Sequence, residues 1–505
     1  LYPSWARPWA RLGVAAEGME DSKAAFQAYR RAVELEPSAQ HMALLAAAAA
    51  AVEGIDAKAE KAKGDAAFSS KPPEFGEAIA AYTVAIAGHP AAVPMKELEA
   101  LAEQEQKLMG SGNRINAEEQ FRQAAKNLQE ATASKDTLEV SVLYGNRAAA
   151  LCHLQCWTAA VQDARMAARL QQSAKARCRL GVALLGAGQP EDAYTEFAWA
   201  LAIDSHYALA RSGLEACLSA IPKWKSREAQ RRWRLSQDSG RPRAFTKVWM
   251  ISDLHCDQKG NAEWCQLLDD AEFQEDVLIV AGNVAETYRA VIQSLKVLRG
   301  KFRRVFYVPG NRDLALNASE VRTSRFPDSI AKLLALLKAC EEIEVDVLPA
   351  AIGQDVYVVP LFSWYNAEFD KRSRPDPNIG FDSQCVWPLD QHQLWKWMLK
   401  LNEAHLHVYR GTVLTVSHFL PLTTLPFDVA GKQAQAMGCE EIEDQLRKVR
   451  SSAHVYGHST IRSLQVHGGT TFGNHALGLV TDENEVPAGP RLLFDGAKGV
   501  VKSSA

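Results

Sequence analysis

In the second half of this chain, five short runs of strand-forming residues each lead into a cluster of polar residues. The runs are Val248–Ile251, Val277–Val280, Val305–Val308, Val413–Val416 and Ala453–Tyr456. They alternate with helical patterns, and this alternation is typical of α/β domains. Ligands of α/β sheets bind beyond the carboxyl ends of the strands. We therefore expect the five polar clusters to meet at one site.

The five clusters contain side chains that bind metal ions in proteins. In chain order these residues are Asp253, His255, Asn283, Asn311, His418 and His458. Carboxylate, imidazole and amide oxygen donors suit divalent cations when they converge from separate loops. Glycines precede three of these residues and permit sharp turns and close backbone approach. Core packing explains such a set of polar residues after five strands poorly.

In this order the clusters resemble the five motifs of calcineurin-like metallophosphoesterases: D-x-H, G-D-x-x-D/E, G-N-H-D/E, a lone H, and G-H-x-H. The resemblance covers about residues 247–474. It implies an α/β sandwich of two mixed sheets flanked by helices, and hydrolysis of a phosphate ester by metal-activated water. It also implies one or two divalent metal ions, of which Mn, Fe, Zn and Mg are all candidates. The implied ligands are Asp253 and His255 for a first ion, Asn283 between the two ions, and Asn311, His418 and His458 for a second.

Three positions depart from the family pattern. Asn283 replaces the bridging aspartate and offers a neutral oxygen, and Thr460 replaces the last histidine of G-H-x-H. Arg312 replaces the histidine of G-N-H-D/E. We expect Arg312 to be catalytic through electrostatic stabilisation of the transferring phosphoryl group. A guanidinium group is not a general acid at neutral pH, so good leaving groups are favoured.

Two functions remain open from the sequence. One is a working hydrolase with an altered metal site. The other is a catalytically weakened or dead phosphoesterase fold that acts as a scaffold or adaptor. Glu286 or Asp313 could supply the missing negative charge, or could simply orient neighbouring loops. His475 could substitute for the histidine lost at Thr460, or could be an ordinary loop histidine.

The first half of the chain is repetitive and helical. Three segments match the tetratricopeptide pattern of paired helices, in which small residues let the helices approach closely and an aromatic residue fills the gap between them. The matching residues include Gly13 with Tyr29, Gly64 with Tyr82, and Gly181 with Phe197. Repeats of this kind stack into an all-α superhelix. The sequence thus predicts a tetratricopeptide superhelix ahead of the α/β domain.

These repeats resemble the tetratricopeptide domains of co-chaperones, which hold the C-terminal carboxylates of chaperones in a clamp of Lys and Asn residues. The corresponding donors are Lys61, Asn146, Lys175 and Arg179. Ammonium, amide and guanidinium groups all donate hydrogen bonds to carboxylates. Asp65 stands where the family has asparagine, and it would repel such a ligand. The resemblance implies a protein partner, with a chaperone tail as the candidate, whereas the alternative is a solvated set of helix charges.

We expect four segments along the chain. They are a partial repeat unit at 1–55, a repeat domain at 56–220 with a helical insertion at 91–140, a basic linker at 221–246, and the phosphoesterase domain at 247–505. The linker is rich in lysine and arginine, and we interpret it as a solvated capping helix and hinge rather than as an RNA-binding or nuclear-import patch.

Bulk composition narrows the partners and the compartment. Net charge is only −3, and the most apolar run, residues 42–52, is short, so we expect neither nucleic acid nor a membrane as a partner. The nine cysteines are scattered and odd in number, as in proteins of a reducing compartment. We therefore expect a cytoplasmic protein. The chain begins with Leu1, so we also expect an incomplete N-terminus with an unreadable targeting signal.

Overall fold

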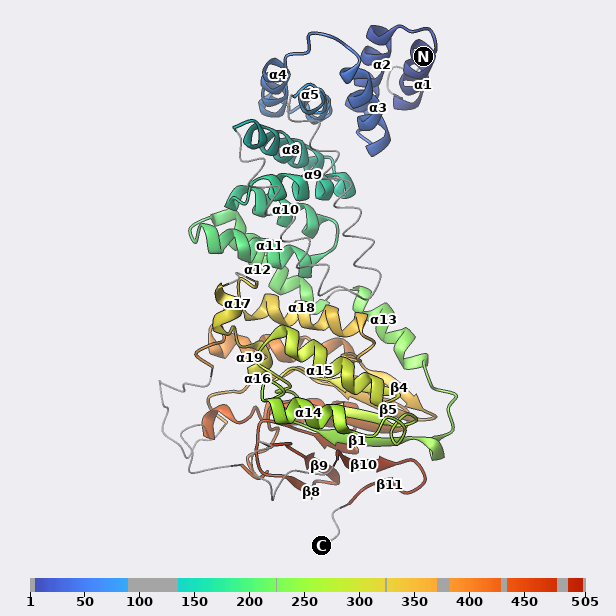
Figure 1. Ribbon diagram of the computed structural model, residues 1–505, viewed down its shortest axis with the longest axis vertical. Coiled ribbons are helices and arrows are strands. Elements are labelled where there is room, and N and C mark those ends of the chain that lie inside the picture. The colour runs from blue at the N-terminus through green and yellow to red at the C-terminus, as the bar shows by residue number, and fades with distance from the viewer. Residues whose placement is uncertain are drawn as a thin grey trace. The chain divides into compact units, whose positions relative to one another are not determined.

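The computed structural model describes residues 5–89, 135–223, 225–322, 325–369, 382–427, 434–478 and 489–502. It divides into two compact units, Leu1–Leu218 and Ser219–Ala505 (Figure 1). Most of the expected insertion at 91–140 lies outside the described residues, and its last six residues begin helix α8.

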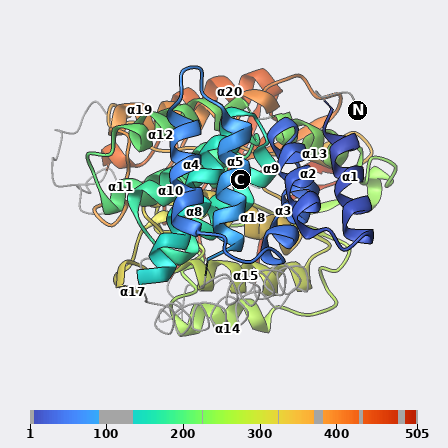
Figure 2. The ribbon, with the colours of Figure 1, turned by 90° about the horizontal axis from the view of Figure 1, so that it is seen from above.

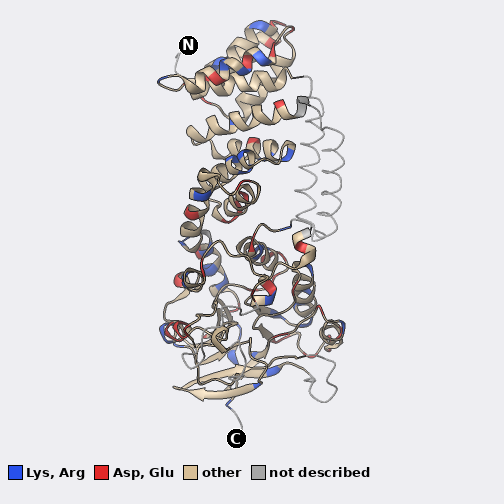
Figure 3. Cartoon of the chain, turned by 90° about the vertical axis from the view of Figure 1, so that its left-hand side faces the viewer, with Lys and Arg blue, Asp and Glu red and all other residues tan. Residues whose placement is uncertain are grey.

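The described part of unit 1 is all helical, as the sequence predicts. Its helices are α1 (Ala6–Gly18), α2 (Ser22–Leu35), α3 (Ala39–Ala50), α4 (Ala57–Ser69), α5 (Phe75–Ala87), α8 (Lys135–His153), α9 (Trp157–Leu170), α10 (Ala174–Gly186), α11 (Pro190–Ile203) and α12 (Ala208–Ala220). Side chains of Asp21, Ser38 and Asp56 cap the starts of α2, α3 and α4. Figure 3 shows acidic and basic residues interspersed along these helices, in line with the small net charge.

In each of the three matching segments, the glycine of one helix contacts the aromatic residue of the next. A methyl group added at Gly13 would lie 2.4 Å from Tyr29, and one added at Gly64 would lie 2.7 Å from Tyr82. The same addition at Gly181 would lie 2.7 Å from Phe197. Separations this short are steric clashes. Each glycine is therefore required for close packing within the helix pairs α1–α2, α4–α5 and α10–α11.

Unit 2 contains two mixed sheets, as predicted. The first has the strand order β11-β10-β1-β2-β3 and the second β4-β5-β6-β7-β9-β8. Strands β1, β2 and β3 pair in parallel, as do β5, β6, β7 and β9. The strands are β1 (Lys247–Ile251), β2 (Val277–Val280), β3 (Arg304–Tyr307), β4 (Ala350–Gly353), β5 (Val356–Pro360), β6 (Thr412–Val416), β7 (Ala453–Val455), β8 (Ser463–His467), β9 (Thr470–Asn474), β10 (Arg491–Asp495) and β11 (Gly499–Val500).

Helices flank both sheets. Figure 2 shows α14 and α15 on one side of unit 2, with α19 and α20 on the other. The helices of this unit are α13 (Lys225–Ser236), α14 (Lys259–Leu267), α15 (Tyr288–Lys301), α16 (Asn311–Leu314), α17 (Ala318–Arg322), α18 (Ser329–Glu342), α19 (Gln391–Lys400) and α20 (Glu441–Val449).

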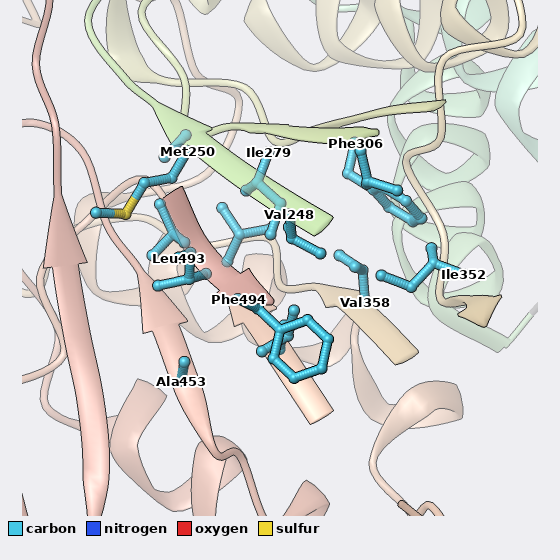
Figure 4. Packing of buried hydrophobic residues seen from close by; sticks show 14 of the residues in the cluster. Val248, Met250, Ile279, Phe306, Ile352, Val358, Ala453, Leu493 and Phe494 are labelled. Atoms are coloured by element: carbon cyan, nitrogen blue, oxygen red, sulfur yellow. The ribbon is translucent and has the colours of Figure 1, made fainter. Parts of the chain in front are cut away.

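A buried apolar core fills the space between the two sheets (Figure 4). Val248, Ile279 and Phe306 project from the first sheet toward Ile352 and Val358 of the second. Fully burying a side chain of this size contributes roughly 1.5–3 kcal/mol. The core fixes the two sheets against each other, and it thereby fixes the loops that follow their parallel strands.

The basic segment expected as a linker, residues 221–246, belongs to unit 2. Helix α13 packs against β4, and its Arg234 forms an ion pair with the buried Asp346. Asp238, which follows this helix, pairs with both Arg303 and Arg304. Acidic partners far along the chain thus neutralise part of the charge of this segment.

Candidate functional site

The loops after the parallel strands hold their polar residues in left-handed backbone conformations. The φ angles are 51° at Asp253, 46° at His255, 55° at Asn283 and 64° at His458. Each such residue costs on the order of 1 kcal/mol or more, and this strain concentrates at functional sites. The backbone strain at these four residues therefore lowers the stability of the fold, and it accompanies the orientation of their side chains toward the site.

Asp253 is buried, and both of its carboxylate oxygens accept hydrogen bonds from other residues of the candidate site. Its Oδ1 accepts a hydrogen bond from Nδ2 of Asn283 at 3.0 Å, and its Oδ2 accepts one from the backbone N–H of His458 at 3.1 Å. Burial raises the pKa of Asp253 to about 7, although these hydrogen bonds oppose the shift. A nearby cation would relieve the cost of keeping this buried carboxylate charged.

The amide of Asn283 is fixed by both of its neighbours. Its Oδ1 accepts from the backbone N–H of Arg312 at 3.1 Å, while its Nδ2 faces Asp253. The opposite amide orientation would oppose two oxygens at one end and two N–H groups at the other. The oxygen expected to bridge two ions is therefore already engaged in a hydrogen bond.

Three atoms that can bind a metal ion converge around the His418 ring. Nε2 of His418 lies 3.2 Å from Oδ1 of Asn311 and 3.2 Å from Nδ1 of His458. Nδ1 of His418 donates to the carbonyl oxygen of Ala281 at 2.8 Å, which leaves a lone pair on Nε2. Nδ2 of Asn311 donates to Asp382, which turns the amide oxygen toward His418. Lone pairs that face one another in this way fit a shared cation.

The histidines of the site are held neutral. Burial lowers the pKa of His255 and of His458 to about 4, and it lowers the pKa of His418 well below its ordinary value. Neutral imidazole is the form that binds metals. Within the described residues, no group of three or more His, Cys, Asp and Glu forms a metal site by itself. The donor set that fits a cation here combines imidazoles with an amide oxygen.

Arg312 lies at the edge of this cluster, on α16. Its Nη1 contacts Oε1 of Glu286 at 2.5 Å, and its side chain is 38% exposed. The guanidinium also lies close enough to His255 to help depress the pKa of that imidazole, after the larger effect of burial. Arg312 is thus a cation held next to the histidines yet accessible to a ligand from solvent.

The structure distinguishes the other candidates of the sequence. Glu286 holds Arg312, whereas Asp313 accepts hydrogen bonds from the backbone N–H groups of Asn283, Val284 and Gly310. Asp313 therefore joins two of the site loops. Thr460 is exposed, and Nε2 of His475 donates to the carbonyl oxygen of Gly489 at 3.2 Å.

Two glycines allow the loops to approach. A methyl group added at Gly310 would lie 2.3 Å from Oδ1 of Asn283, and one at Gly457 would lie 2.2 Å from the carbonyl oxygen of Ala281. Both additions would also press against the His418 ring. These contacts explain why glycine precedes Asn311 and His458.

Sequence reasoning missed Asp382. Its Oδ1 accepts from Nδ2 of Asn311 at 3.2 Å, and it also bonds to the hydroxyl group of Tyr365. Burial raises the pKa of this carboxyl group. Asp382 lies between β5 and α19, in a connection without motif or periodicity, so no local signal pointed to it.

The residues of the predicted carboxylate clamp in unit 1 gather around Asp65. Nζ of Lys61 lies 2.5 Å from Oδ2 of Asp65. Asn146 and Tyr82 donate to Oδ1 of Asp65 at 3.1 and 2.7 Å. Arg179, on α10, lies against Gly145. Lys175 is exposed one helical turn before Arg179, and charge repulsion from the Arg179 guanidinium lowers the pKa of Lys175.

Two mixed sheets, with imidazole, carboxylate and amide groups at the ends of their parallel strands, define a domain of the phosphoester-hydrolase type. Residues 246–461 match the family model described as calcineurin-like phosphoesterase. The C-terminal unit is therefore a calcineurin-like phosphoesterase domain.

The acyl-carrier-protein phosphodiesterase PptH of Mycobacterium tuberculosis is 35% identical over 132 residues. That match covers 24% of this chain and only 38% of the relative. The crystal structure of the phosphopantetheinyl hydrolase PptH from the same organism matches 49% of this chain and 96% of that chain, with 23% identity and a TM-score of 0.42.

An O-GlcNAc transferase mutant of Thermobaculum terrenum matches 71% of this chain and 68% of that chain, with 12% identity and a TM-score of 0.18. Neither TM-score reaches 0.5, so the two structural likenesses carry no conclusion about function. Among the described residues, no helix has both the length and the hydropathy that crossing a bilayer requires.

Proposed function

We propose that the C-terminal domain is a metal-dependent phosphoesterase that hydrolyses a phosphate ester with water as the nucleophile. The observation that carries this proposal is the approach of Asn311 Oδ1 and His458 Nδ1 to His418 Nε2, each at 3.2 Å. When bound, a divalent ion supplies Lewis acidity toward the phosphoryl group and lowers the pKa of water.

The residues of the chain divide the remaining work. Asp253, His255 and Asn283 would hold a metal ion from one side, and Asn311, His418 and His458 would hold it from the other. Arg312 binds the phosphoryl oxygens and stabilises the negative charge of the transition state. Glu286 orients the Arg312 guanidinium through their ion pair.

Leaving-group chemistry narrows the substrate. Arg312 does not protonate a leaving oxygen at neutral pH, so esters with acidic leaving groups react faster. The mycobacterial relative is by name a phosphodiesterase, and a phosphodiester is therefore the first substrate class to test. Bis(p-nitrophenyl) phosphate and p-nitrophenyl phosphate separate diesterase from monoesterase activity with the same leaving group.

Metal analysis of the purified full chain tests the proposal directly. We expect at least one equivalent of Mn, Fe or Zn after dialysis, together with turnover of an aryl phosphate ester in added Mn²⁺. Metal content near zero, without turnover in added Mn²⁺, would leave the alternative of a scaffold. The hydrogen bond between Asn283 and Asp253 favours that alternative, because it gives the buried Asp253 carboxyl group a partner without a metal ion.

For unit 1 we propose recruitment of a protein partner through Lys61, Asn146, Lys175 and Arg179, with a chaperone C-terminal tail as the candidate ligand. The gathering of donors from α4, α8 and α10 near one internal carboxylate supports this role. Binding of a peptide that ends in Glu-Glu-Val-Asp is the test. The nine free cysteines support the further proposal of a reducing, cytoplasmic compartment.

A further inference from the structure

The segment 382–385 is fixed against the loop that carries Asn311. Oδ1 of Asp382 accepts from Nδ2 of Asn311 at 3.2 Å, and Sγ of Cys385 lies 3.5 Å from the carbonyl oxygen of the same residue. The carbonyl oxygen of Gln384 accepts from the backbone N–H of Leu316 at 2.9 Å. Three contacts thus hold Asp382 in register with one end of the metal centre.

The hydrogen bond to Asp382 determines which end of the Asn311 amide faces the centre. Because Nδ2 is directed to a carboxylate, Oδ1 points to Nε2 of His418. Hydrogen bonds to ionised groups are roughly twice as strong as neutral ones, so an ionised Asp382 would hold the Asn311 amide firmly in this orientation. An amide that donates to a carboxylate also carries more negative charge on its oxygen, since hydrogen bonds in sequence polarise one another.

The charge of Asp382 matters because the centre has few anions. Asn283 takes the position of a carboxylate in the family motif, so Asp253 is the one carboxylate among the six proposed ligands. A second negative charge one hydrogen bond behind Asn311 would favour a divalent cation at that end of the site. Tyr365, whose hydroxyl group bonds Asp382, is buried and packs against Phe419, next to His418.

We propose that Asp382 is the positioning residue of the metal centre: it orients and polarises the Asn311 amide and supplies negative charge that Asn283 lacks. The inference rests on the metal-dependent function proposed above. It assigns to the described segment 382–385, which precedes α19, a direct part in metal affinity.

Mn²⁺ titration calorimetry of the full chain tests this proposal, with Asp382→Asn as the main variant. The asparagine keeps the shape and can still accept from Asn311, but it removes the charge. We expect Mn²⁺ affinity to fall about 10–100-fold, the usual effect of removing a partner of a metal ligand. The increase in Tm produced by Mn²⁺ should fall in parallel, while the Tm in chelator stays near that of the unaltered protein.

The control is Glu368→Gln, which removes an exposed carboxylate from the same connection and should leave Mn²⁺ affinity unchanged. If the unaltered chain binds Mn²⁺ and Asp382→Asn binds it within twofold, the role of Asp382 is refuted while the metal centre stands. If the unaltered chain binds no Mn²⁺, the proposed function itself fails. Asp382→Ala, which loses both charge and acceptor, should bind at least as weakly as Asp382→Asn.

Discussion

Asn283 donates a hydrogen bond to Asp253 across 3.0 Å, at the point where the family motif has a second carboxylate. On this side of the candidate metal centre, an amide and a carboxyl group form a hydrogen bond in place of two carboxyl groups. Asparagine at position 283 weakens the binding of a cation in comparison with aspartate. It also makes the protein more stable without a metal ion, because two buried carboxylates would repel each other.

Asn283→Asp should therefore make stability depend strongly on metal. In chelator we expect a loss of about 1–3 kcal/mol, because the hydrogen bond is replaced by repulsion between buried carboxylates. In excess Mn²⁺ the Tm should recover or exceed that of the unaltered chain, and turnover should rise. Thermal melts with and without Mn²⁺ measure this difference. Equal Tm changes under both conditions would contradict a metal ion at Asn283.

Arg312→His should alter leaving-group preference. A histidine there can protonate a leaving oxygen, and general acid catalysis typically contributes 10²–10⁴-fold. We expect the rate on phenyl phosphate, relative to p-nitrophenyl phosphate, to rise about tenfold or more. Arg312→Ala should slow both esters without that change in ratio. An unchanged ratio in Arg312→His would indicate that this side chain lies away from the leaving group.

His418→Ala should abolish Mn²⁺ binding, because His418 Nε2 is the atom that both Asn311 and His458 approach. His475→Ala is the matched control, since Nε2 of His475 bonds to the carbonyl oxygen of Gly489. Calorimetric titration should show no Mn²⁺ binding for the first variant and near-normal binding for the second. The reverse result would indicate that His475, and not His418, binds the metal ion.

His454 should contribute to acid unfolding. It is buried between Thr415 and Ser417, and burial lowers its pKa from 6.5 to about 3. Because its folded pKa lies below the unfolded value, its contribution to stability is complete above pH 6.5 and is lost as pH falls toward 3. The slope is about 1.4 kcal/mol per pH unit at most. The pH dependence of the free energy of unfolding, measured in denaturant melts between pH 7 and 4, gives the number of protons taken up on unfolding. We expect His454→Gln to take up about one proton fewer than the unaltered chain.

Asp65→Asn should strengthen peptide binding by unit 1. Asp65 now occupies the donors of Lys61, Asn146 and Tyr82, so a carboxylate ligand must compete with it. We expect about tenfold tighter binding of a peptide ending in Glu-Glu-Val-Asp, and loss of binding on Lys175→Ala. Lys58→Ala, an exposed lysine on α4, should have no effect. Absence of binding in both Asp65→Asn and the unaltered chain removes the clamp proposal.

The sequence predicted those parts of the molecule that depend on local pattern. Each polar cluster follows a strand, and neighbouring parallel strands end at the same edge, so Asp253, Asn283 and Asn311 had to lie close together. The helix pairs were predictable for a similar reason, because Gly13 and Tyr29 occupy fixed places within one repeat.

What depends on tertiary register was not predictable. A basic run such as 225–236 has the same local pattern whether it is solvated or paired, and the acid that binds Arg234 lies more than a hundred positions away. Asp382 was missed for the same reason. Its importance comes from the residue it faces and not from its neighbours in sequence.

The ion pair between Arg234 and Asp346 has a practical consequence for dissecting this protein. A fragment cut at the first motif, near Lys247, would retain the aspartate and lose the arginine, and Arg303 would lose Asp238 in the same cut. We expect such a fragment to be less stable, because it leaves these charged side chains without their partners, and its inactivity would then be mistaken for a dead catalytic centre. A fragment that begins at Ser219, where the second unit begins, keeps both partners, so the phosphoesterase domain and the helical unit are best separated there.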